Sequence, residues 1–168
     1  IIRSVHEFVK RREPTREPVS MQSLIDNVMP LIELQAHQFR VAIQVSVGLR
    51  LPAVLADRVM LEQVLLNLTR NAIEAMQQVP SERRILRISI AAERAGSTPA
   101  NVIVSVIDQG HGIAPEVAEN LFSPFFSTKA EGMGIGLKIC RTTLEFHGGT
   151  LTYVNNPRGG TIFRFSLP

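Results

Sequence analysis

Apolar and polar residues follow two different periods along this chain, and together they predict a mixture of helices and strands. Ser20 can cap a helix, and after it apolar side chains recur at helical spacing, at Leu24, Ile25, Val28, Leu31 and Ile32. The segment VAIQVSV at 41–47 alternates instead and is rich in β-branched residues, which predicts a strand. A second, short strand is expected in AVLA at 53–56.

The helix that Asp57 can cap has one apolar face with a polar flank. Its apolar positions fall within an arc of about 120°; they are Leu61, Val64, Leu65, Leu68, Ala72, Ala75 and Met76. Four polar side chains share one flank of this stripe, namely Gln63, Asn67, Asn71 and Glu74. The helix is therefore expected to pack on the core and to carry these polar side chains beside its buried face.

The second half of the chain adds further strands and helices. Strands are predicted at about 85–92 and at 101–107, and the second is apolar on both faces, which favours a central position in its sheet. A short helix after Pro115, an aromatic loop, a glycine run and a helix to about Phe146 follow. The turn NPRGG joins two last strands, TLTYVN and TIFRFSL, into a hairpin. The expected fold is an α/β (α+β) two-layer sandwich, in which a mixed, mostly antiparallel sheet carries its helices on one face.

The composition is that of an ordinary globular domain. A length of 168 residues fits one domain, and 45% hydrophobic with 20% charged residues exclude disordered, collagen-like and coiled-coil proteins. No apolar run approaches the roughly 18 residues that a membrane span needs. The net charge is +3, but the basic residues are dispersed, so we expect no nucleic-acid partner. The single cysteine, Cys140, excludes an internal disulfide, has the setting of a packed core thiol and fits the cytoplasm.

The first residues have a different character from the rest. The chain does not begin with methionine, its opening segment is helical in pattern, and Pro14 and Pro18 then interrupt helix formation. We therefore expect a piece of a longer protein. Residues 1–18 would be the end of an upstream helix plus a linker, and residues 19–168 would be the domain proper.

Asn67 and Asn71 are unusual in a packed helix, because asparagine is a poor helix former and a buried amide needs partners. One interpretation is that their amides bind neighbouring loops. The other is that their carbonyl oxygens face a hard cation such as Mg2+ beside phosphates.

Two glycine-rich segments offer ligand contacts. DQGHGI at 108–113 follows a central strand; its carboxylate could accept a hydrogen bond from an exocyclic amine, or the segment could be a simple turn. GMGIGLKI at 132–139 runs straight into a helix, where exposed amides and the helix dipole favour an anion, and Lys129 stands just before it. A glycine hinge without a ligand is the alternative for this second segment.

In this order, the segments resemble the ATP-binding catalytic domain of bacterial sensor histidine kinases with a short ATP lid. This domain belongs to the wider GHKL group, which includes gyrase-type topoisomerases and mismatch-repair ATPases. NLTRNA is similar to the family's N box, DQGHGI to its G1 box, LFSPFFSTK to its F box and GMGIGL to its G2 box. The resemblance covers about residues 19–168 and implies the GHKL, or Bergerat, ATP-binding fold.

The resemblance implies ATP and Mg2+ as ligands, with roles residue by residue. Asn71 and Asn67 would hold Mg2+ on the phosphates, and Asp108 would bind the adenine amine. The implied nucleotide-binding residues are Asn71, Asp108, Gly110, Gly112, Ile113, Phe122, Lys129, Gly132, Gly134, Ile135, Gly136 and Leu137. The implied catalytic residues are Asn67, Asn71, Glu74 and Lys129. Met133 stands where the family commonly has threonine, which affects the expected phosphate contacts.

One position bears on the reaction. Hydrolysing members of the group place a glutamate four residues before the metal-binding asparagine, whereas this chain has Asn67, which cannot act as a general base. Glu74 could orient a water or a side chain, or face solvent. The resemblance thus favours phosphoryl transfer to a protein histidine. A GHKL-type ATPase and a nucleotide-binding or interaction module without transfer activity remain the alternatives.

The phosphoacceptor is expected outside this chain. His6-Glu7 imitates the acceptor pair, but the following residues lack the family's continuation, so the acceptor histidine should lie on an upstream dimerisation and phosphotransfer hairpin. The implied partners are that hairpin and the receiver domain of a response regulator. The piece itself is expected to be largely monomeric and cytoplasmic.

Overall fold

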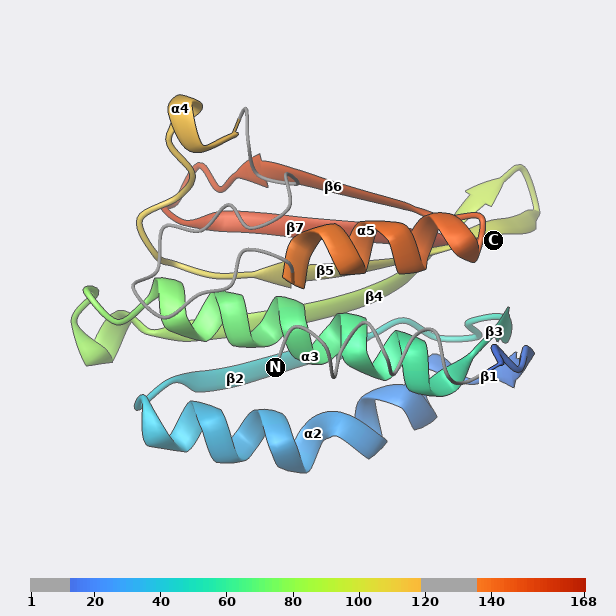
Figure 1. Cartoon of the computed structure of the whole chain (residues 1–168), viewed down its shortest axis with the longest axis horizontal. Coiled ribbons are helices and arrows are strands. Elements are labelled where there is room, and N and C mark those ends of the chain that lie inside the picture. The colour runs from blue at the N-terminus through green and yellow to red at the C-terminus, as the bar shows by residue number, and fades with distance from the viewer. Residues whose placement is uncertain (1–12, 119–135) are drawn as a thin grey trace.

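The structure, a computed structural model, describes residues 13–118 and 136–168 of the chain (Figure 1). In chain order its elements are β1 (Glu17–Val19), α2 (Met21–Gln38), β2 (Ala42–Val47), β3 (Val54–Ala56), α3 (Arg58–Ala75), the 3-10 helix η1 (Ser81–Arg83), β4 (Ile85–Ala95), β5 (Thr98–Ile107), α4 (Pro115–Ala118), α5 (Gly136–Phe146), β6 (Thr150–Asn155) and β7 (Thr161–Leu167).

Five strands form the main sheet, in the order β2-β4-β5-β7-β6. The β2–β4 pair is parallel, and the other three pairs are antiparallel. Helices α2, α3 and α5 lie side by side in one layer over one face of this sheet (Figure 1). The two-layer α/β sandwich with a mixed, mostly antiparallel sheet is confirmed, and so are the central position of β5 and the terminal hairpin.

The core lies between the helix layer and the inward face of the sheet. The predicted stripe of α3 is buried, apart from Ala75 at its end, which is half-buried, and α3 buries Met60, Thr69 and Ile73 as well. Cys140 is fully buried in α5, as its neighbours suggested. Among the helices that the structure describes, none combines the length and the apolarity that a membrane span requires.

Leu31 belongs to the apolar pattern that predicted α2, but it is 56% exposed in the structure. At about 100° per residue, the buried positions of α2 from Met21 to Ala36 share one arc, and Leu31 falls just outside it. Helix α2 lies at the edge of the layer, with α3 as its helical neighbour, so its buried face is narrower than that of α3 (Figure 1).

Strand β1 was not predicted, because Pro14 before it and Pro18 within it indicated a linker. It pairs antiparallel with β3, with Pro18 opposite Leu55, and a two-stranded ribbon tolerates a proline that a central strand would exclude. Just before β1, the Arg16 guanidinium lies 4.7 Å from the Phe146 ring centroid and donates to the Phe146 carbonyl at 2.6 Å. The segment before Val19 therefore packs against the end of α5.

A buried hydrogen-bond network joins the start of α3 to the end of α5. Asp57 caps α3 by accepting from Met60 N at 3.1 Å, and its other oxygen accepts from Thr15 N at 2.8 Å. The Asp57 N–H donates to His147 Nε2 at 3.0 Å, and His147 Nδ1 lies 2.7 Å from the Thr143 carbonyl oxygen. These partners assign the Nδ1–H tautomer to His147. The chain entering the domain, α3 and α5 thus meet at one point.

Candidate functional site

The polar flank of α3 forms one wall of the candidate site. Asn67, Asn71 and Glu74 are half-buried there, whereas Gln63 is exposed. Glu74 Oε1 accepts from Arg70 Nε at 3.1 Å, one turn earlier on the helix. The two asparagines therefore lie along the margin of the core, where their amides can reach either neighbouring protein groups or a ligand.

Asp108 follows the last residue of β5 and is 2% exposed. Its Oδ1 accepts two backbone hydrogen bonds, from Gly110 N at 2.9 Å and from Thr161 N at 3.1 Å. Its own N–H donates to the Thr161 carbonyl at 3.0 Å. Across the described residues no hydrogen bond to Oδ2 is found, so Oδ2 is the oxygen that can accept from a ligand.

The surroundings of Asp108 shift its pKa in opposite directions. Burial raises the pKa of Asp108 above its ordinary value, while the hydrogen bonds from Gly110 and Thr161 and the charge of His111 lower it. Burial dominates, because the carboxylate gives up most of its hydration. A donor that reaches Oδ2, such as an exocyclic amine, would stabilise the charged form and would be bound in return.

Gly110 joins the loop after β5 to α3. A Cβ at this position would collide with the carbonyl oxygen of Ala75 and would lie 2.9 Å from its carbonyl carbon. Only glycine allows the two backbones to come this close. This contact holds the loop that carries Asp108 against the end of α3, close along the helix to Asn71.

The start of α5 lies against the middle of α3. A Cβ built on Gly136 would lie 3.7 Å from Asn67 Oδ1. One turn further on, burial raises the pKa of the Cys140 thiol to about 12, although a hydrogen bond from the Asn67 side chain lowers it. Asn67 therefore lies between the first turn of α5 and the buried thiol, and the positive end of the helix dipole lies beside its amide.

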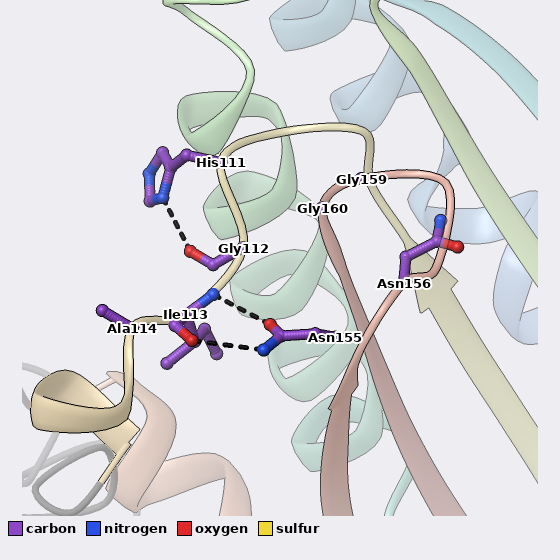
Figure 2. Close-up of a pocket in the computed structure, with 8 residues that line it drawn as sticks. All are labelled: His111, Gly112, Ile113, Ala114, Asn155, Asn156, Gly159 and Gly160. Carbon is purple, nitrogen blue, oxygen red and sulfur yellow. Dashed lines mark hydrogen bonds between the residues drawn. The ribbon is translucent and has the colours of Figure 1, made fainter.

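Gly112 and Ile113 lie on the outer side of the site, against the β6–β7 hairpin. Asn155 accepts from Ile113 N at 3.0 Å and donates to the Ile113 carbonyl at 3.3 Å (Figure 2). A cavity of about 290 Å³ lies beside this contact, lined by His111, Gly112, Ile113, Ala114, Asn155, Asn156, Gly159 and Gly160. His111 is exposed, with Nδ1 2.7 Å from the Gly112 carbonyl oxygen.

The structure thus brings Asn67, Asn71, Asp108, Gly110 and Gly136 around one helix, α3. Leu137, the second residue of α5, is half-buried. Five expected site residues lie outside the described residues, namely Phe122, Lys129, Gly132, Gly134 and Ile135. In the part of the chain that the structure describes, no three His, Cys, Asp or Glu side chains cluster as a metal site. The amide oxygens of asparagines such as Asn67 and Asn71 are hard donors of the kind that suits Mg2+.

Three residues of the site were missed by sequence reasoning: Asn155, Gly160 and Thr161. The turn NPRGG was interpreted only as a hairpin connection, and nothing local relates it to Asp108. Gly160, at φ +90, lies so close to Asp108 that a Cβ would be 2.6 Å from Oδ1. The adjacent glycines were the available signal for such a close approach.

Comparison of the sequence with protein families places residues 56–168 in one family. It is described as Histidine kinase-, DNA gyrase B-, and HSP90-like ATPase. The C4-dicarboxylate transport sensor protein DctS of Rhodobacter capsulatus is 41% identical over 168 residues, which is 100% of this chain and 25% of DctS. Other curated relatives are also much longer than this chain, which spans 17% of the sensor histidine kinase TmoS of Ectopseudomonas mendocina and 35% of the sensor histidine kinase ZraS of Escherichia coli O157:H7.

Solved structures give the same family. The catalytic domain of histidine kinase ThkA is 35% identical with a TM-score of 0.72, over 94% of this chain and 96% of that one. ThkA in complex with response regulator protein TrrA is 32% identical with a TM-score of 0.75, over 99% of this chain and 46% of that one. Full-length ShkA in complex with AMPPNP is 29% identical with a TM-score of 0.76, over 94% of this chain and 32% of that one.

The contact at Gly110 predicts a large stability effect of one methyl group. Gly110→Ala should lower the free energy of unfolding by about 1–3 kcal/mol or more, because the loop must move away from α3. Gly136→Ala is the matched control, since its Cβ would make only an ordinary contact with Asn67. Urea unfolding measures both variants, and equal stabilities would contradict the close approach.

The raised pKa of Asp108 predicts a pH trend. With a folded pKa above the unfolded value, the contribution of Asp108 to stability is present at low pH and is lost as pH rises through the folded pKa. Asp108→Asn keeps an acceptor for both amides and carries no charge. The variant should therefore gain stability relative to the parent as pH rises from the ordinary carboxyl pKa through the raised pKa of Asp108. Asp26→Asn, on the exposed surface of α2, controls for general pH effects, and the opposite trend would contradict the sign.

Proposed function

The chain belongs to the histidine kinase-, DNA gyrase B- and HSP90-like ATPase family, as a catalytic domain of the sensor histidine kinase type, and we propose that it binds Mg-ATP and transfers the γ-phosphoryl group to a protein histidine. The acceptor would be a histidine on a separate helical hairpin, from which the receiver domain of a response regulator takes the phosphoryl group.

One observation carries this proposal. Helix α3 contacts the Asp108 loop through Gly110 near its end and the start of α5 through Asn67 near its middle. A carboxylate suited to an amine and a helix start suited to an anion are therefore held against the same helix, and Asn71 lies between the two contact points, Asn67 and Ala75. Adenine with a triphosphate has these two chemistries joined in one molecule. The AMPPNP bound to ShkA supports the same ligand class.

The two asparagines fit Mg2+, and we propose Asn71 with Asn67 as its protein ligands. Amide oxygens are hard donors and add no negative charge beside a triphosphate. When bound, Mg2+ would neutralise charge on the phosphates as the phosphoryl group leaves. The buried core behind α3 fixes the position of the helix that carries both asparagines.

The residues of this chain favour transfer over hydrolysis. Asn67 stands where a water-activating glutamate would be needed, and an amide cannot take a proton from water. Glu74 is held in an ion pair with Arg70, and we assign it an orienting role beside Asn71. Lys129 would contact the phosphates as a point charge. Asp108 would accept from the adenine amine through Oδ2, while its Oδ1 stays bound to Gly110 and Thr161.

The proposed partners and location follow from the same chemistry. The ThkA–TrrA complex supports a response regulator as the recipient. Because dimerisation would be the task of the hairpin, the domain alone should be monomeric. ATP and a reduced, buried Cys140 agree with a cytoplasmic location.

Titration calorimetry tests the ligand. The parent chain should bind a slowly hydrolysed ATP analogue in a Mg2+-dependent manner and in preference to the GTP analogue. Asp108→Asn should weaken binding about 10- to 100-fold, since its amide would face the adenine amine donor to donor. Asn71→Ala should remove the Mg2+ dependence, while Asp26→Asn should bind like the parent. If neither Asp108→Asn nor Asn71→Ala changes binding, the proposal is wrong and the two asparagines are polar packing groups.

Reconstitution tests the reaction. With radiolabelled ATP, the chain plus the upstream hairpin should give an acid-labile label on the hairpin histidine, and Asn71→Ala should abolish it. The chain alone should remain unlabelled, and stoichiometric label on His6 would contradict the proposed division of roles. Turnover to ADP by the chain alone would indicate an ATPase of the same fold. Nucleotide binding with no label and no turnover would indicate a binding module.

A further inference from the structure

Asn155, the last residue of β6, makes a pair of hydrogen bonds with the backbone of one residue far away in the sequence. Its Oδ1 accepts from Ile113 N at 3.0 Å, and its Nδ2 donates to the Ile113 carbonyl at 3.3 Å. Figure 2 shows the amide plane aimed at this peptide segment. One donor and one acceptor on the same residue reproduce the pairing that a neighbouring strand would offer. The side chain thus acts as a substitute for a strand beside Ile113.

The segment before Ile113 is shaped to lie against this side chain. Gly112 has φ +76, a conformation that favours glycine, and a Cβ there would lie 3.2 Å from Asn155 Oδ1 and 3.5 Å from the Gly160 carbonyl oxygen. The contact is therefore made by the backbone of the loop, and it requires that position 112 carry no side chain.

The same hairpin holds the other end of the loop. Asp108 exchanges two hydrogen bonds with Thr161, through its N–H at 3.0 Å and its Oδ1 at 3.1 Å. Asn155 and Thr161 are direct partners in the β6–β7 ladder. One pair of facing residues therefore fixes both ends of the 108–113 loop, at Asp108 and at Ile113. The middle of the loop, at Gly110, lies against α3.

We propose that Asn155 is a positioning residue for recognition of the adenine amine. The inference rests on the proposed function, in which Asp108 binds that amine. Asn155 acts through Ile113 and the loop backbone, and it contacts neither Asp108 nor the proposed base-binding oxygen directly. Without the two Asn155–Ile113 hydrogen bonds, the loop keeps only its contacts at Asp108 and Gly110. The direction of Asp108 Oδ2 should then be less well defined. Loss of these hydrogen bonds should therefore reduce the selectivity for the adenine amine more than it weakens binding of the phosphates.

Asn155→Asp is the most direct test, because the change is nearly isosteric. The aspartate can still accept from Ile113 N, but its second oxygen faces the Ile113 carbonyl oxygen, which repels it. Asn156→Asp is the matched control, with the same change of charge at the next residue. Asn156 Oδ1 accepts from Arg158 N at 3.2 Å, and an aspartate keeps that bond.

The measured quantity is the ratio of the Kd for a nucleotide without the adenine amine to the Kd for ATP. Calorimetry on the whole 168-residue chain gives Kd for ATP and for purine riboside triphosphate, which lacks the amine, both with Mg2+. In the parent and in Asn156→Asp, ATP should bind more tightly than purine riboside triphosphate. In Asn155→Asp this ratio should fall about tenfold, with the Kd for purine riboside triphosphate little changed.

A second measurement covers the case of a poorly folded aspartate variant. In Asn155→Ala, hydrogen exchange at the Ile113 amide should accelerate, while exchange at the Thr161 amide should stay as in the parent. Unchanged exchange at Ile113 would overturn the positioning role.

The outcomes separate the two proposals. If Asn155→Asp weakens both nucleotides equally, or behaves like Asn156→Asp, the positioning role is wrong and the proposed function stands on the parent's own preference for ATP. If the parent shows no Mg2+-dependent preference for the amine, the proposed function fails and the role of Asn155 fails with it.

Discussion

The buried carboxylate of Asp108 is the constraint around which this site is built. An ionised group with 2% exposure is tolerated only when hydrogen bonds replace its hydration. Gly110 and Thr161 supply two backbone amides to one oxygen. Gly160 carries no side chain that would collide with Asp108, and Gly110 carries none that would keep its loop away from Ala75. The glycines of this region therefore serve the charge of Asp108 as much as they serve the turns.

Helix α3 unites the parts of the site because it is attached to the rest of the molecule along its whole length. Its start is capped by Asp57, which also contacts Thr15 and His147. Its middle meets α5 at Asn67 and Cys140, and its end meets the loop at Gly110. A helix fixed at start, middle and end holds its two asparagines in a constant position relative to the Asp108 loop and to α5.

Much of the fold could be predicted from the sequence, because its signals are local. The stripe of α3, the two-sided apolar strand β5 and the terminal hairpin all follow from periods of a few residues. Strand β1 was missed because its pairing with β3 depends on a distant segment. The exposure of Leu31 could not be read from the apolar pattern of α2, because the width of a buried face depends on neighbouring helices. The motif residues were recognised by resemblance, but Asn155 was not, since its bond to Ile113 joins distant positions and leaves no periodic trace.

The single parallel pair in the sheet has a consequence for how the molecule assembles. Asn155 and Thr161 pair across a short turn, so the hairpin of β6 and β7 is a local structure that forms on a scale of about microseconds. Ala42 pairs with Ile85, and all of β3, α3 and η1 lies between them in the chain. Closing that long loop costs conformational entropy before the hydrogen bonds of the β2–β4 pair can form and offset the cost. The β2 edge should therefore join the sheet well after the local β6–β7 hairpin has formed, because Ala42 and Ile85 must first meet across that long loop.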